Sequence, residues 1–338
     1  TQGFEYWGFE YAETMSFDVG LDEGAGSGVA DASVTLPAGT DLRGSHALVA
    51  HLDGPGLPGQ IVLGANDGQV FVLDGNLEDY PDGGDPEPFA VGLRGGAPVT
   101  WNLPPAVGDV DHDGEDEIVL TAAEGLYVFR KDGTPLVAGP AEDFGLYAGL
   151  NDCALPPVLV PSEDPTEGLH AGFATVVVVD RALGETSVRL FAGSDATEPQ
   201  ALSLGPVAMP GPPSLVGYNL ALAYTDTMAG QGMLTVVTLP WVEVGEGTVR
   251  LDLPLAVEPG PFAPSGGLAA GASEDVPVWS IMVTGADGGG ETLFVAPGLA
   301  EARASQVWTN DVDARSSLAA GGAVVIDGAY GRLGQGGD

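Results

Sequence analysis

Basic side chains are the scarcest feature of this 338-residue chain, which holds 10 Lys and Arg against 48 Asp and Glu, a formal net charge of −38. Lys131 is the sole lysine. Binding to DNA or RNA needs clustered Lys and Arg, so no nucleic-acid partner is expected, and an anionic membrane surface is disfavoured for the same reason. The charge favours solubility, cations and an extracellular or cell-surface setting. A base-poor composition set by a GC-rich genome is the alternative explanation.

Cysteine and long apolar segments are also nearly missing. Cys153 is alone, so no intrachain disulfide can form, and stability must come from the core and from metal. No apolar run approaches the ~20 residues that span a bilayer, so we expect no transmembrane segment. No signal peptide is visible. Because the chain begins at Thr1 rather than at Met, we expect a processed chain or a fragment.

Helical periodicity is almost absent. Short Val-, Leu- and Ala-rich runs alternate with turn residues instead, and the chain holds 53 Gly and 27 Pro. Apolar residues still make up 44% of the chain, which argues against disorder. This pattern predicts an all-β fold of short strands joined by frequent turns.

Segments that pair a small residue or Pro with an apolar run recur about every 50 residues. Taking one apolar residue of each as equivalent, the spacings are 58, 52, 56, 53 and 50, for Val49, Val107, Leu159, Leu215, Leu268 and Leu318. A second and a third strand follow in each unit. We predict these strand pairs at Gln60–Ala65 with Gln69–Gly75, Glu117–Thr121 with Leu126–Phe129, Thr175–Asp180 with Ser187–Gly193, Leu220–Asp226 with Met233–Leu239, and Trp279–Thr284 with Glu291–Gly298.

A period of this length with about four strands per unit is typical of a β-propeller. Stacking the sheets face to face buries both faces of each one, which no sheet can do alone. We therefore predict one propeller domain, 1–338, of six blades, with seven as the alternative. The repeats lie at about 42–95, 100–150, 152–205, 208–258, 262–310 and 312–338. The last repeat is incomplete, and we expect residues 1–36 to complete it, with Phe4–Tyr11 as an added strand.

The densest acidic cluster lies in the second repeat. Asp109, Asp111, Asp113 and Glu117 occupy positions 1, 3, 5 and 9 of a loop whose position 6 is Gly114. Alternate carboxylates on a tightly turned backbone can converge on one hard cation, and Ca²⁺ prefers such oxygen ligands. The backbone carbonyl of Glu115 is a natural further ligand.

Two other kinds of metal site fit this loop less well. An EF-hand needs a bidentate Glu at position 12, where Leu120 stands, and needs helices rather than strands on both sides. A transition metal is disfavoured because the donors are all oxygen and His112 alternates away from the acids. The sequence therefore predicts one Ca²⁺ site.

The stretch Val107–Leu120 resembles the calcium-binding FG-GAP repeat of integrin alpha-subunit propellers and their bacterial relatives. That pattern has Asp at position 9, where this chain has Glu117, and Asp116 offers a substitute. The resemblance implies a Ca²⁺ that stiffens one blade and an extracellular or cell-surface protein, with the periplasm as the alternative location. His51–Gln60 in the first repeat keeps Asp53 but lacks the other acids, so we expect it to bind no metal.

Other candidates are weaker. Asp311 and Asp313 begin a similar loop that neither a third Asp nor a Gly follows, so we interpret them as a turn. The four histidines share no spacing, and Cys153 lacks an identifiable His partner. No nucleophile-elbow, P-loop or zinc-protease motif occurs. The tryptophans are expected to pack between blades, with sugar stacking as the alternative; they are Trp7, Trp101, Trp241, Trp279 and Trp308.

Three functions remain open. The first is a calcium-stabilised, non-catalytic binding or adhesion module whose partner is a protein or a glycan at the cell surface. The second is a polysaccharide lyase or hydrolase, against which the scarcity of bases counts. The third is a structural subunit of an extracellular filament or surface assembly.

Overall fold

The computed structural model describes all-β structure in residues 5–6, 14–18, 32–42, 47–50, 52–53, 59–111, 113–162, 173–193, 197–216, 219–238, 250–268, 279–296 and 301–308. By contacts the chain divides into two compact units, Thr1–Ser203 and Leu204–Asp338. Each unit is described by itself below. Within the described residues, no helix is long and apolar enough to span a membrane.

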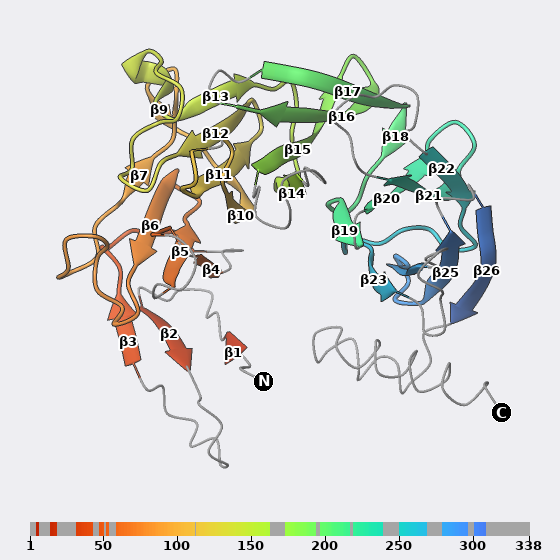
Figure 1. The fold of residues 1–338 in the computed structure, drawn as a ribbon, viewed down its shortest axis with the longest axis horizontal. Coiled ribbons are helices and arrows are strands. Elements are labelled where there is room, and N and C mark those ends of the chain that lie inside the picture. Colours follow the sequence, from red (N-terminus) through yellow and green to blue (C-terminus); the bar gives the residue numbers. More distant parts are fainter. Residues whose placement is uncertain are drawn as a thin grey trace. The chain divides into compact units, whose positions relative to one another are not determined.

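Unit 1 holds three antiparallel sheets of four strands each, every one paired in chain order (Figure 1). The first sheet contains β4 (Leu48–Ala50), β5 (Gln60–Gly64), β6 (Gln69–Leu73) and β7 (Ala90–Val91). The second contains β10 (Trp101–Gly108), β11 (Glu117–Ala122), β12 (Gly125–Phe129) and β13 (Leu146–Gly149). The third contains β14 (Val158–Ser162), β15 (Phe173–Ala182), β16 (Glu185–Ala192) and β17 (Thr197–Gly205), which runs just into unit 2.

Unit 2 holds two more antiparallel sheets, one of five strands and one of four. One sheet contains β18 (Val207–Ala208), β19 (Ser214–Val216), β20 (Asn219–Asp226), β21 (Gln231–Thr238) and β22 (Arg250–Pro254), with β18 and β19 both paired to β20. The other contains β23 (Ser265–Leu268), β24 (Trp279–Thr284), β25 (Gly290–Ala296) and β26 (Glu301–Trp308). In the first five repeats, the residues taken as equivalent lie in β4, β10, β14, β19 and β23, near the start of each sheet in chain order. They are Val49, Val107, Leu159, Leu215 and Leu268. The predicted blade-like, four-stranded antiparallel sheets are therefore confirmed.

The N-terminal segment forms a separate antiparallel sheet of β1 (Glu5–Tyr6), β2 (Thr14–Asp18) and β3 (Ala32–Thr35). This is one strand short of the other sheets. Its predicted complement at 312–338 lies outside the described residues, so closure of a ring and the number of blades stay predictions. A small hairpin of β8 (Leu93–Arg94) and β9 (Ala97–Pro98) and the 3-10 helix η1 (Ala141–Asp143) were not expected from the sequence.

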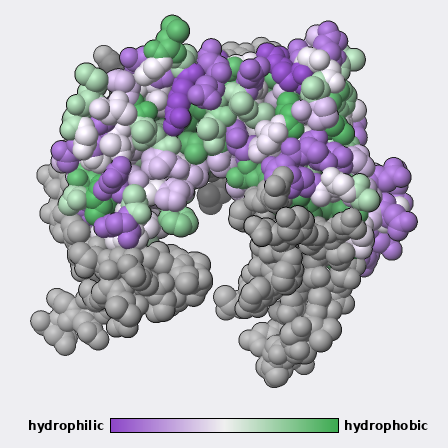
Figure 2. Space-filling model, turned by 180° about the vertical axis from the view of Figure 1, so that it is seen from behind, coloured by the Kyte–Doolittle hydropathy of each residue, from purple (hydrophilic) through white to green (hydrophobic). Residues whose placement is uncertain are grey.

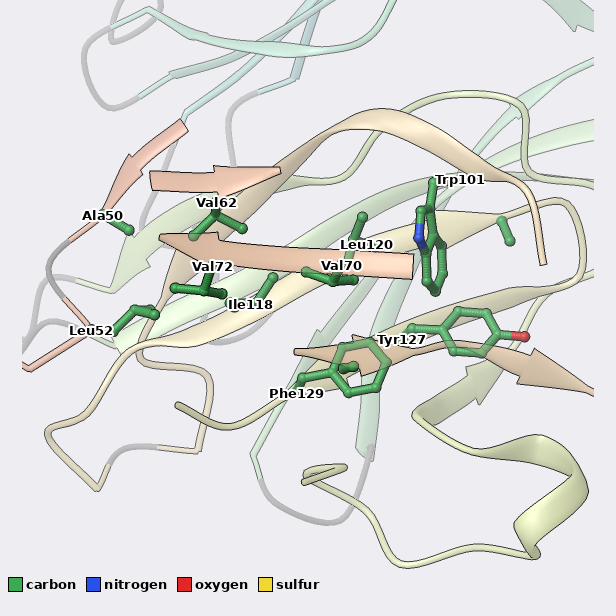
Figure 3. Packing of buried hydrophobic residues seen from close by; sticks show 12 residues of the cluster. Ala50, Leu52, Val62, Val70, Val72, Trp101, Ile118, Leu120, Tyr127 and Phe129 are labelled. Atoms are coloured by element: carbon green, nitrogen blue, oxygen red, sulfur yellow. The ribbon is translucent and has the colours of Figure 1, made fainter. Parts of the chain in front are cut away.

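The second sheet of unit 1 buries both faces against its neighbours, because alternate residues of a strand point to opposite sides. Every residue of β11 and β12 is buried. Ile118, Leu120, Tyr127 and Phe129 pack against the first sheet (Figure 3). The alternate residues of the same two strands, which point to the other face, pack against the third sheet. They are Val119, Leu126 and Val128. Continuous apolar runs follow from burial on two faces, as expected for stacked blades.

The same rule holds elsewhere. In the first sheet, Leu63, Phe71 and Leu73 pack with Val34 and Leu36 of the N-terminal segment. In unit 2, one core joins β20 and β21 to β24 and β25, through residues such as Leu234 and Ile281. On the coloured surface in Figure 2, hydrophilic residues are interspersed with hydrophobic ones.

Candidate metal centre

The acidic loop closes the β10–β11 hairpin. Gly108 pairs with Glu117, so residues 109–116 form the connection. Val110 is fully buried in the core that the second sheet shares with the third, and it anchors the loop. Gly114 has φ +91°, a left-handed conformation that residues with a Cβ rarely adopt. The loop therefore turns sharply at the position where the sequence places glycine.

Three of the predicted ligands come together in this loop. Asp109, Asp111 and Glu117 each offer a carboxylate oxygen, and these atoms lie within 4.8 Å of one another. Asp109 is 8% exposed and Glu117 is 1% exposed. Within the ranges described above, this is the one such group of His, Cys, Asp or Glu that could hold a metal ion.

Hydrogen bonds hold two of these carboxylates in place. Asp109 Oδ1 accepts the N–H of Asp113 at 3.2 Å, and Asp109 Oδ2 accepts the N–H of Gly114 at 3.0 Å. Glu117 Oε2 accepts the N–H of Val110 at 2.7 Å. The carboxylates at positions 1 and 9 are thus fixed by the loop's own backbone.

Asp111 provides the test of whether a cation fits. Its Oδ2 lies 3.5 Å from the guanidinium of Arg130, and its side chain is 7% exposed. Its Oδ1 is buried and has no hydrogen-bond partner. A buried carboxylate oxygen without a partner costs about 1–3 kcal/mol or more. The all-oxygen donor set and this unpartnered atom both fit a hard divalent cation.

The electrostatics of the group are unfavourable without a counter-charge. The pKa of Glu117 is raised to about 8, and burial is the largest cause. The negative charges of Asp111, Asp113 and Asp109 contribute to this rise, and the hydrogen bond from the Val110 N–H opposes it. A cation bound here would offset the repulsion that raises the pKa of Glu117.

The two other predicted ligands lie outside this group of three carboxylates. Asp113 is exposed, and its Oδ1 accepts the N–H of Glu115 at 2.9 Å. Glu115 is also exposed, and its carboxylate contacts Lys131 Nζ at 2.5 Å. The roles predicted for the Asp113 side chain and the Glu115 carbonyl stay predictions.

Two features of the site were not expected from the sequence. One is the hydrogen bond from Val110 N–H to Glu117, which holds this side chain beneath the loop. The other is Arg130, which follows β12. Ile118 pairs with Phe129, so continuing this register places Arg130 opposite Glu117. Counting the register from the turn between β11 and β12 would have found it.

The first repeat has an equivalent loop in which the amide of Gln60 takes the place of the Glu117 carboxylate. Gln60 begins β5 as Glu117 begins β11, and its Oε1 accepts the N–H of Leu52 at 2.9 Å. Its Nε2 donates to Asp53 at 3.1 Å, and the hydroxyl of Tyr80 donates to Asp53 at 2.7 Å. The amide and the hydroxyl thus each donate to one oxygen of Asp53. The expectation that this loop binds no metal stays a prediction.

The other candidates whose side chains are described are buried, hydrogen-bonded or packed against the core. Cys153 is buried beside Asn102 and Leu155, and burial raises the pKa of its thiol. Trp101 is 3% exposed, donates to the carbonyl of Gln69 and packs edge-on against Tyr127. Trp279 packs against the core of unit 2. The other candidates lie outside the described residues or side chains, and they are Trp7, His46, His51, His112, His170, Trp241, Trp308, Asp311 and Asp313.

Comparison with known proteins adds little. No protein-family profile matches the chain, and no curated protein matches it. Among solved structures, the chain is similar to one titled "Crystal structure of BBS1N in complex with ARL6DN, soaked with lead". The sequence identity is 10%, the TM-score is 0.43, and the match covers 81% of this chain and 70% of the other. A likeness at this level supports no functional statement.

Proposed function

We propose that this chain is a non-catalytic binding, adhesion or assembly module of an extracellular or cell-surface protein, and that one Ca²⁺ stabilises its second repeat. The observation that supports the metal is Asp111 Oδ1, which is buried beside two further carboxylates and lacks a partner. The D-x-D-x-D-G spacing and the four-stranded sheets support an FG-GAP-type repeat.

Asp109, Asp111 and Glu117 would hold the ion, and Asp113 and the Glu115 carbonyl are further candidates from the loop. The ion would supply the positive charge that these carboxylates lack. Asp109 follows β10 and Glu117 begins β11, so the bound ion would tie the end of one strand to the start of the next. This is a stabilising role, which leaves the recognition of a partner to other loops of the repeats.

The partner class follows from charge and from the resemblance. A net charge of −38 disfavours nucleic acid and suits a medium rich in cations. FG-GAP propellers are modules of secreted and cell-surface proteins, which implies a protein or a glycan as the partner. Light scattering of the purified chain separates a monomeric binding module from a subunit that assembles with copies of itself.

Thermal unfolding with and without Ca²⁺ tests the metal. We expect Ca²⁺ to raise the Tm and a chelator to lower it, because a ligand that binds only the folded state stabilises it. Asp111→Asn should abolish the increase. Glu124→Gln is the matched control, since Glu124 is an exposed acid in the turn at the other end of the β11–β12 hairpin. A Tm that is the same in Ca²⁺ and in chelator would contradict the proposal.

A further inference from the structure

Two of the chain's ten basic residues are adjacent and lie over the acidic loop. Arg130 Nη2 lies 3.5 Å from Asp111 Oδ2, and Arg130 Nη1 donates to the carbonyl of Pro135 at 3.2 Å. Lys131 contacts Glu115, which is outside the group of three carboxylates. The guanidinium is therefore fastened to the backbone at one nitrogen and directed at a candidate metal ligand with the other.

The two carboxylate oxygens of Asp111 have different surroundings. Oδ2 faces Arg130, whereas Oδ1 is buried without a partner on a side chain that is 7% exposed. A cation held by Oδ1 would lie close to the guanidinium, because both are bound to one carboxylate. Like charges so close repel, and because the Arg130 side chain is 38% exposed, solvent weakens this repulsion without removing it.

We propose that Arg130 sets the affinity of the cation site: it is a built-in counter-charge that stabilises the metal-free loop and weakens Ca²⁺ binding. The proposal rests on the proposed function, because it concerns the same cation. Removing the guanidinium takes away the ion-pair partner that Asp111 has among the described residues, which destabilises the ion-free protein. It also takes away the repulsion that the bound ion meets, which tightens binding. The substitution should therefore lower the stability of the ion-free protein and raise its affinity for Ca²⁺. If the arginine had only a structural role, its removal would lower both the stability and the affinity.

Calorimetric titration with Ca²⁺ at about 0.15 M monovalent salt, where exposed charges are screened, tests the proposal. Arg130→Gln should bind Ca²⁺ at least about fivefold more tightly than the unsubstituted chain and should melt at a lower temperature in chelator. Arg130→Lys retains the charge and should stay within about threefold of the original affinity. Lys131→Gln is the matched control, because Lys131 pairs with an exposed carboxylate, and it should stay within about twofold.

Each outcome decides the matter. Unchanged or weaker binding by Arg130→Gln would overturn the role of Arg130 while leaving the Ca²⁺ site intact. Equal tightening by the Gln and Lys variants would also overturn it, since the charge would then not be the cause. If neither the original chain nor Arg130→Gln binds Ca²⁺, both proposals fail. Should Arg130→Gln not fold, Arg130→Met retains the aliphatic stem and is measured in the same way.

Discussion

Asp180 shows how much a single buried carboxylate can organise. It is 2% exposed and accepts four hydrogen bonds, from the backbone N–H groups of Asn151 and Asp152, from the Asn151 amide and from Arg189. These bonds tie β15 to the connection between the second and third sheets. Burial alone would raise the pKa of Asp180, but the hydrogen bonds outweigh burial and hold its pKa below the ordinary value.

Asp180→Asn should therefore lower the free energy of unfolding by about 2–3 kcal/mol at neutral pH. Because the folded-state pKa is depressed, this contribution is present above the unfolded-state pKa of about 4 and is lost as the pH falls through the folded-state value. Urea unfolding at about pH 7 and about pH 3 measures the difference, which should narrow in acid. Asp152→Asn, at an exposed neighbour, is the control. An equal difference at both pH values would contradict the assignment.

Leu183 is the opposite case, a residue that conflicts with its position. It is 106% exposed and has φ +54° in the two-residue turn between β15 and β16, followed by Gly184 at φ +86°. Such turns favour Asn followed by Gly, because Asn tolerates the left-handed region better than an apolar residue does.

Leu183→Asn should accordingly stabilise the protein by about 0.5–1 kcal/mol, with no loss of side-chain packing. Leu183→Val should destabilise it, since a β-branched residue adopts this conformation least readily. Chemical denaturation of the three proteins makes the comparison. If the Asn variant is the least stable of them, the leucine has a partner that its exposure does not reveal.

At the scale of elements, the first two repeats give the same hairpin two different acidic loops. Glu117 and Gln60 both accept a backbone N–H from the preceding loop. In the second repeat the side chain is an acid among acids, whereas in the first it is an amide that donates to Asp53. In the first repeat, the amide N–H of Gln60 gives Asp53 the positive partner that a bound cation would give the carboxylates of the second repeat.

Gln60→Glu should destabilise the protein by about 1–3 kcal/mol without divalent cations, because a 4% exposed carboxylate would face Asp53 with no donor between them. Thermal and chemical unfolding in chelator check this. Gln60→Met, which removes the hydrogen bonds without adding charge, separates the two effects and should cost less. A Glu variant as stable as the original chain would show that the amide has no such role.

At the scale of the whole molecule, a net charge of −38 opposes the compact state through self-repulsion. Monovalent salt screens this repulsion over a distance of about 10 Å at 0.1 M. We therefore expect the Tm in chelator to rise between about 10 mM and about 300 mM KCl. A Ca²⁺ effect that persists at the higher salt concentration then reports the specific site. A Tm that falls with added KCl would contradict this expectation.

The sequence by itself determined the elements. Runs such as Glu117–Thr121 and Trp279–Thr284 are mostly apolar and recur at a fixed period, so the identity of the strands and the hairpins that join them follow from local pattern. The fourth strands were not located, because β17 and β26 are mixed in polarity and carry no apolar run. The hairpin of β8 and β9 was missed because nothing in its short sequence repeats elsewhere.

For the metal centre, spacing alone identified the loop and its acids, because alternate residues on a tight turn share one side. Only the tertiary structure decided which acids are buried together, since burial depends on the neighbouring sheet into which Val110 packs. It also decided that Arg130, from another strand, lies against Asp111. Contacts between strands depend on register and packing, which no local pattern of residues contains.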